Sequence, residues 1–126
     1  MIIKNAVVYG KDFTPINTDI EIENGLIKSL KKTDAPGMDF SGCVVVPGFI
    51  DIHIHGCNFA DATDGKSDSV AKMSLWLAQN GITSFCPTTM TLPIETLKKS
   101  FSYIAETMGN EEGAYIHGVN MEGPFI

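Results

Sequence analysis

Hydrophobic and polar positions alternate along the first 46 residues in the manner of β-strands. A first strand is expected over residues 3–9 and a further short strand over residues 43–46. The clearest turn signal is Asn24-Gly25, which stands between two runs of alternating apolar residues and suits the type I′ turn of a β-hairpin. No polar cluster of catalytic character occurs here, so the pattern predicts a small structural β-layer.

The pattern changes at Pro47-Gly48, after which strand-like and helix-like segments alternate. Strands are expected at residues 47–56, 82–86 and 114–121. Apolar residues at helical spacing predict one helix from about Ser67 to Asn80 and another from Thr91 or Leu92 to Met108. This alternation indicates βαβ units with a parallel sheet, and therefore the α/β fold class.

Length and composition narrow the class of protein. The 126 residues suffice for one domain of ordinary size, and 44% are hydrophobic. The net charge of −6 and the lack of a basic run argue against nucleic acid or an anionic membrane as partner. Three cysteines without regular spacing do not make a disulfide framework, and neither a signal peptide nor a membrane span is evident. We therefore expect a reduced, cytoplasmic protein.

The strand predicted at residues 47–56 carries two histidines two positions apart. Side chains at i and i+2 of a strand share a face, so His53 and His55 point the same way while Ile50, Ile52 and Ile54 fill the other face of a buried strand. Two imidazoles on one side of a strand end form half of a metal site. The alternative is that each histidine is a hydrogen-bonded core or rim residue.

A carboxylate is expected to join this pair. The carboxyl ends of parallel strands lie on one rim, which would bring His53 and His55 together with Thr88, Thr89 and Glu122. Two histidines and one glutamate are a known ligand set for a catalytic zinc, and iron or manganese accepts the same donors. The alternative for Glu122 is a surface carboxylate at a turn.

Other polar residues near this rim have less specific interpretations. Asp51 could orient a ligand from one step deeper in the strand, or serve as a structural hydrogen-bond acceptor. Thr88 and Thr89 could line the pocket or cap the loop. Cys57 is expected to pack near the site as a reduced thiol, and His117 to lie on the opposite face of its strand.

Three motifs resemble known enzymes. Residues 46–56, VPGFIDIHIHG, resemble the signature of the amidohydrolase superfamily, which are metal-dependent hydrolases on a (β/α)8 barrel, usually preceded by a small β-sandwich. The segments HGCN at 55–58, GITSFCPTTM at 81–90 and EGPFI at 122–126 look more specifically like the N-acetylglucosamine-6-phosphate deacetylase family. One departure is Asn120, where relatives commonly have histidine, which leaves this position only a role in lining the site.

The resemblance implies a domain plan and a reaction. Residues 1–46 would be a β-sandwich portion, and residues 47–126 the first three β/α units of an incomplete barrel. His53, His55 and Glu122 would ligate one or two divalent ions, zinc, iron or manganese. The parent enzyme would convert N-acetylglucosamine 6-phosphate into glucosamine 6-phosphate and acetate, and by the same likeness would be a homo-oligomer, a dimer.

The same resemblance implies that part of the active site lies outside this chain. A full barrel needs about 250 residues. The catalytic aspartate and the phosphate-binding groups are therefore expected beyond Ile126, and the chain alone is expected to be inactive. We expect a truncated segment whose open sheet edge associates with itself or with the rest of the enzyme.

Two other functions remain open at this point. One is another amidohydrolase, similar to dihydroorotase, hydantoinase or adenine deaminase. The other is a non-catalytic module that binds metal. Metal analysis separates the second from an enzyme fragment, because a module should hold stoichiometric metal and a fragment that lacks ligands should hold little.

Overall fold

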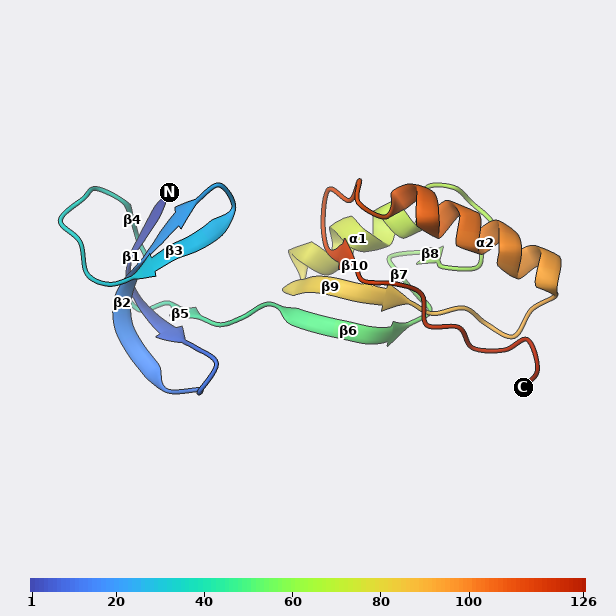
Figure 1. The fold of residues 1–126 in the computed structure, drawn as a ribbon, viewed down its shortest axis with the longest axis horizontal. Helices are drawn as coiled ribbons and strands as arrows, with labels where there is room; N and C mark the ends of the chain where they lie inside the picture. The colour runs from blue at the N-terminus through green and yellow to red at the C-terminus, as the bar shows by residue number, and fades with distance from the viewer. The chain divides into compact units, whose positions relative to one another are not determined.

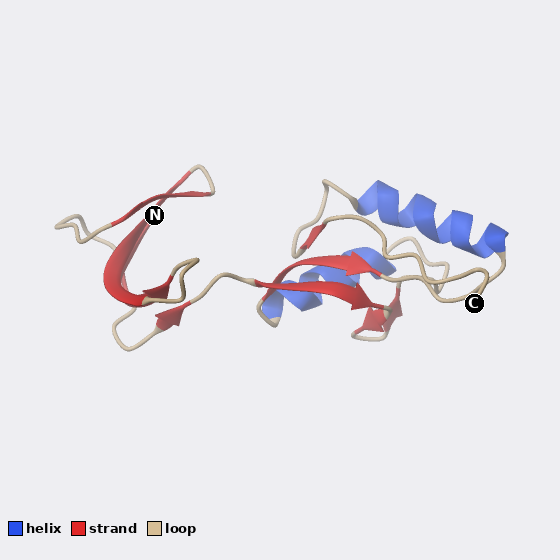
Figure 2. Cartoon of the chain, turned by 60° about the horizontal axis from the view of Figure 1, so that its bottom comes forward, coloured by secondary structure: helices blue, strands red, loops and turns tan.

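The chain forms two structural units, residues 1–47 and 48–126, in the computed structural model, which describes residues 1–126. Residues 1–47 contain strands and loops, whereas both helices belong to residues 48–126 (Figure 2). The chain is thus of mixed α/β composition. Neither helix has the length and apolar character needed to cross a membrane.

The first unit is a five-stranded sheet. Its strands are β1 (Ile2–Tyr9), β2 (Pro15–Glu23), β3 (Leu26–Leu30), β4 (Met38–Asp39) and β5 (Val44–Val45). The order is β3-β2-β1-β4, and β5 also pairs with β1. The hairpin predicted at Asn24-Gly25 is confirmed: it joins the antiparallel strands β2 and β3, with φ of 52° and 75° at the two turn residues.

Asp19 links the strands of this sheet to a distant loop. Its carboxylate accepts hydrogen bonds from the backbone N–H of Asn5 and of Thr33, both at 2.9 Å. The Nζ atoms of Lys4 and Lys32 lie 3.5 and 3.4 Å from the same carboxylate, whose side chain is only 1% exposed. A buried charge with this many donors is well compensated. The backbone hydrogen bonds lower the pKa of Asp19 well below its usual value.

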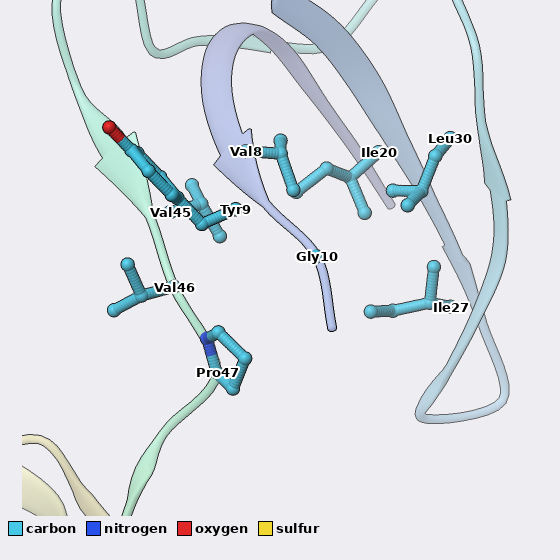
Figure 3. A pocket seen from close by; sticks show the side chains of 9 residues that line it. All are labelled: Val8, Tyr9, Gly10, Ile20, Ile27, Leu30, Val45, Val46 and Pro47. Atoms are coloured by element: carbon cyan, nitrogen blue, oxygen red, sulfur yellow. The ribbon is translucent and has the colours of Figure 1, made fainter. Parts of the chain in front are cut away.

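An apolar pocket of about 220 Å³ lies within this first unit (Figure 3). Its walls come from β1, β2, β3 and the segment around β5. None of the lining side chains is a carboxylate, imidazole, amine or thiol, and the phenol of Tyr9 is the only polar side-chain group among them, so the pocket carries no metal-ligand set. The lining residues are Val8, Tyr9, Gly10, Ile20, Ile27, Leu30, Val45, Val46 and Pro47.

The second unit confirms the predicted alternation of strands and helices. The order is β6 (Phe49–Ile54), β7 (Gly56–Cys57), β8 (Ala60–Asp61), α1 (Ser69–Gln79), β9 (Ile82–Pro87), α2 (Ile94–Thr107) and β10 (Tyr115–Ile116). Strands β10, β9 and β6 form one parallel sheet in that order. Figure 1 shows β6 and β9 side by side, with both helices next to the sheet.

The core of this unit lies between the sheet and its helices. Met73 and Leu77 of α1 and Ile104 of α2 are almost fully buried, as are Phe85 of β9 and Ile116 of β10. The buried positions of the two helices follow the helical spacing seen in the sequence. Strand β9 is the central element, because it pairs with β6 on one side and β10 on the other and α1 packs against it.

Three expectations need correction. The strand expected over residues 114–121 is regular only over Tyr115–Ile116. Beyond it, the His117 N–H donates to Phe85 O (3.1 Å), and the next hydrogen bond to β9 runs from the Asn120 N–H to Pro87 O (3.1 Å). The chain therefore advances three residues here while β9 advances two, which breaks the regular pairing. The loop expected after Gly56 instead contains the β7–β8 hairpin.

The third correction concerns β6, which was expected to be buried. Ile50 and Ile52 are 61% and 69% exposed, because β6 is the edge strand of the sheet. Only Ile54, at its carboxyl end, packs against the core. The end of β6 that carries the histidines is therefore anchored, although the rest of its apolar face is open.

Candidate metal centre

The structure brings His53, His55 and Glu122 together at the carboxyl end of the sheet. Glu122 Oε2 lies 3.4 Å from His53 Nε2 and 3.6 Å from His55 Nε2, and the two Nε2 atoms are 3.4 Å apart. One donor atom from each residue lies within 4.8 Å of the others. The side chains are 53%, 34% and 36% exposed, so the group is open to solutes on one side.

The orientation of His55 leaves one nitrogen free for an ion. Its Nδ1 lies 3.2 Å from the carbonyl oxygen of Thr88. A carbonyl oxygen only accepts hydrogen bonds, so this contact requires a proton on Nδ1 and leaves the lone pair on Nε2. That nitrogen is the one that faces His53 and Glu122. A histidine bonded in this way is a typical metal ligand.

The segment that carries Glu122 is held against the end of β9. Glu122 N–H donates to Thr89 Oγ1 (3.2 Å), and Thr89 N–H donates to Asn120 O (3.0 Å). Gly123 then turns the chain with a φ of 89°, a conformation that side-chain-bearing residues rarely adopt. A Cβ at this position would lie 2.8 Å from the Thr91 Cα. Close approach of these two segments therefore requires glycine beside the carboxylate.

The remaining predicted site residues are placed as follows. Thr88 and Thr89 are fully buried, and both bond the ends of neighbouring strands. Asp51 accepts a hydrogen bond from the backbone of His53, and the Asn120 amide lies against the His53 ring. His117 is outside the group: it is exposed and packs edge-on against Tyr115, with ring centroids 5.0 Å apart.

Cys57 lies near the site but is not part of the group. Its side chain packs against the core, and burial raises the pKa of its thiol, with a smaller contribution from the charge of Asp51. A thiol with a raised pKa is a poor metal ligand, because ligation needs the thiolate. This placement agrees with the expected role of a reduced, packed side chain.

Two imidazole nitrogens and a carboxylate oxygen at this spacing fit a divalent cation. His55 is hydrogen-bonded from behind through its Nδ1, and the partial exposure of all three side chains leaves room for water or substrate on a bound ion. The sequence did not reveal the irregular strand register at this end of the sheet. Pro87 was the available signal, since a proline inside a central strand cannot donate a ladder hydrogen bond.

Comparison with known proteins gives this geometry a context. No family model matches the chain. It is 40% identical over 91 residues, 70% of its length, to N-acetylglucosamine-6-phosphate deacetylase from Bos taurus. It is 31% identical over 125 residues to the Vibrio furnissii enzyme of the same name. The chain resembles part of an N-acetylglucosamine-6-phosphate deacetylase. The likeness read from its three motifs is therefore confirmed.

The fold gives the same result. The crystal structure of N-acetylglucosamine-6-phosphate deacetylase from Thermotoga maritima matches all of this chain with a TM-score of 0.79 at 30% identity. The chain spans only part of each of these proteins: 22% of the bovine deacetylase, 31% of the Vibrio deacetylase and 33% of the Thermotoga structure.

Proposed function

We propose that this chain supplies part of the metal centre of a deacetylase that hydrolyses the acetamide of N-acetylglucosamine 6-phosphate to acetate and glucosamine 6-phosphate. The observation that carries the proposal is the convergence of His53, His55 and Glu122 on one point. The substrate class is supported by the names of the similar proteins from cattle, Vibrio and Thermotoga. Those names favour a phosphorylated amino sugar over the substrates of dihydroorotases, hydantoinases or adenine deaminases.

The two histidines and the glutamate would hold zinc, iron or manganese, as one ion or as part of a pair. Such an ion would polarise the amide carbonyl and lower the pKa of a water molecule from about 15.7 to about 7. The role of this chain is to fix the donors. His55 keeps its Nε2 lone pair directed at the site through the bond from its Nδ1 to Thr88 O. Thr89 holds the backbone that carries Glu122.

For the architecture, we infer that residues 1–47 belong to a small β-sandwich and residues 48–126 to the first three β/α units of a (β/α)8 barrel. The parallel order β10-β9-β6 with intervening helices supports the second part. The proton-transferring carboxylate and the phosphate-binding groups would come from the portion of the deacetylases that this chain does not span. The three free cysteines suit the reducing cytoplasm.

A chimera tests the function. This chain replaces the matching third of the Thermotoga deacetylase, and acetate release from N-acetylglucosamine 6-phosphate is followed with Zn²⁺, Fe²⁺ or Mn²⁺ supplied. We expect activity in the chimera and a loss of at least about 100-fold in kcat in the chimera with Glu122→Gln, since a missing ligand removes more than an outer contact does.

Two results would contradict the proposal. The first is full activity of the Glu122→Gln chimera. The second is a folded chimera, matched to the Thermotoga enzyme by circular dichroism, that releases no acetate with any of the three metals. A His117→Ala chimera serves as the control, because His117 lies outside the group of three, and it should keep its activity.

A further inference from the structure

The peptide unit between Ile52 and His53 sits where the pairing of β6 with β9 is irregular. Asp51 pairs with Phe85, but the next pair is Ile54 with Pro87, so β6 advances three residues while β9 advances two. Such a bulge leaves a residue outside the ladder and redirects the side chains beside it. Here the redirected residue is His53, one of the three members of the candidate metal centre.

Both polar groups of this peptide are bonded by side chains. The N–H of His53 donates to Asp51 Oδ1 at 3.0 Å. The carbonyl oxygen of Ile52 accepts a hydrogen bond from Asn120 Nδ2, also at 3.0 Å, across 68 positions in the sequence. One peptide is therefore held from both ends, by a residue of its own strand and by a residue of the segment beyond β9.

Asn120 has a second contact that the bulge makes available. Its Nδ2 lies 3.4 Å from His53 Nδ1, so the amide rests against the edge of the imidazole. Its backbone is fixed at the same time, because its N–H bonds to Pro87 O and its C=O accepts from Thr89 N–H. Glu122 follows two residues later. Asn120 thus joins the strand of the histidines directly to the segment of the glutamate.

We propose that Asp51 and Asn120 are positioning residues, which stabilise the bulge in β6 and so set the direction of His53 toward His55 and Glu122. This inference rests on the proposed function, because it concerns the assembly of that metal centre. Neither side chain needs to touch an ion or a substrate. Asp51 acts as an acceptor for a backbone N–H, and Asn120 acts as a donor to a backbone carbonyl.

The role of Asp51 predicts a difference between two substitutions. Asp51→Asn keeps an oxygen that accepts from the His53 N–H, whereas Asp51→Ala removes it. In hydrogen–deuterium exchange of the metal-free chain followed by NMR, Asp51→Ala should expose the His53 amide and raise its exchange rate about tenfold or more, which corresponds to about 1.4 kcal/mol. Asp51→Asn should restore the protection.

The role of Asn120 predicts a change in metal affinity. Asn120→Leu keeps the shape of the side chain and removes its donor. In the metal-free chimera with the Thermotoga deacetylase, we expect this variant to bind Zn²⁺ about 10–100-fold more weakly than the unsubstituted chimera, the usual cost of losing a partner behind a ligand. The matched control is Asn80→Leu, which removes the bond from Asn80 Nδ2 to Trp76 O (2.8 Å) at the other end of the sheet and should leave Zn²⁺ affinity unchanged.

The two measurements separate this inference from the proposed function. If Zn²⁺ binding depends on Glu122 but is the same in Asn120→Leu as in Asn80→Leu, and the His53 amide exchanges equally in all Asp51 variants, the positioning roles are wrong while the metal centre stands. If the chimera takes up no Zn²⁺ at His53 and His55, the metal centre itself is wrong. The exchange of the His53 amide then decides alone whether Asp51 holds the bulge.

Discussion

His55 Nδ1 lies 3.2 Å from the carbonyl oxygen of Thr88, a residue 33 positions later in the chain. The contact joins the end of β6 to the end of β9 and determines which ring nitrogen of His55 is available to an ion. Thr88 is also bonded to Ile54, with its Oγ1 accepting from Ile54 N–H (3.0 Å) and its N–H donating to Ile54 O (2.8 Å). The buried Thr88 therefore aligns the two strands just before the histidine.

Replacement of Thr88 tests this alignment. Thr88→Val keeps the shape and removes the hydroxyl, so one buried hydrogen-bond acceptor is lost, at a cost of about 1–3 kcal/mol in the free energy of unfolding. Thr88→Ser keeps the hydroxyl and should lose less. Urea denaturation measures both, with Thr83→Val at an exposed position of β9 as control. Equal stability of Thr88→Val and the unsubstituted chain would contradict the role.

Gly123 provides a second prediction, because the turn after Glu122 needs a residue without a side chain. Gly123→Ala places a Cβ 2.8 Å from the Thr91 Cα, and the segment must move to relieve the contact. In the metal-free chimera, we expect this variant to bind Zn²⁺ more weakly in calorimetry, since Glu122 moves with the backbone.

The control for Gly123 is Gly109→Ala. Gly109 has a similar φ of 80°, but a Cβ there meets nothing within 4 Å. This variant should lose about 1–2 kcal/mol of stability from the backbone conformation alone, with Zn²⁺ affinity retained. If both variants bind Zn²⁺ equally well, Gly123 does not position Glu122.

Asp19 predicts how the stability of the first unit depends on pH. Its folded pKa is lowered, chiefly by the backbone hydrogen bonds from Asn5 and Thr33, then by Lys32. A carboxylate with a lowered folded pKa stabilises the folded state above its unfolded pKa of 3.8, and that stabilisation is lost as the pH falls from there toward the folded pKa.

The test compares the unsubstituted chain with Asp19→Asn by urea denaturation, with the first unit followed through the backbone amides of Asn5 and Thr33. The destabilisation caused by the substitution should be large at about pH 7 and smaller at about pH 3, because below the unfolded pKa the unfolded chain binds a proton at Asp19 while the folded carboxylate remains ionised. Asp34→Asn, at an exposed position, should show little difference between the two pH values. A substitution effect that grows on acidification would overturn the assignment.

Local signals explain what the sequence predicted well. The Asn24-Gly25 turn, the helical spacing of Met73 and Leu77, and the alternation that puts His53 and His55 on one face each depend on neighbours a few positions apart. The meeting of Glu122 with the histidines is long-range, yet it followed from one rule, that parallel strands end on one rim.

The remaining features depend on contacts that no local pattern records. The exposure of Ile50 and Ile52 follows from the edge position of β6, and the alternation of residues along a strand does not reveal which strand lies at an edge. The irregular register around His53 and Asn120 follows from three strands that adjust to one another. The hydrogen bond from Asn120 to Ile52 spans 68 positions and could not be read from either segment alone.

Titration of the metal-free chimera with Zn²⁺, followed through the imidazole NMR signals of His53, His55 and His117, tests the central claim most directly. The account predicts that the His53 and His55 signals shift together along a single binding curve, that Glu122→Gln weakens both, and that His117 does not respond. Separate curves for His53 and His55, an equal response of His117, or no effect of Glu122→Gln would contradict a shared metal centre.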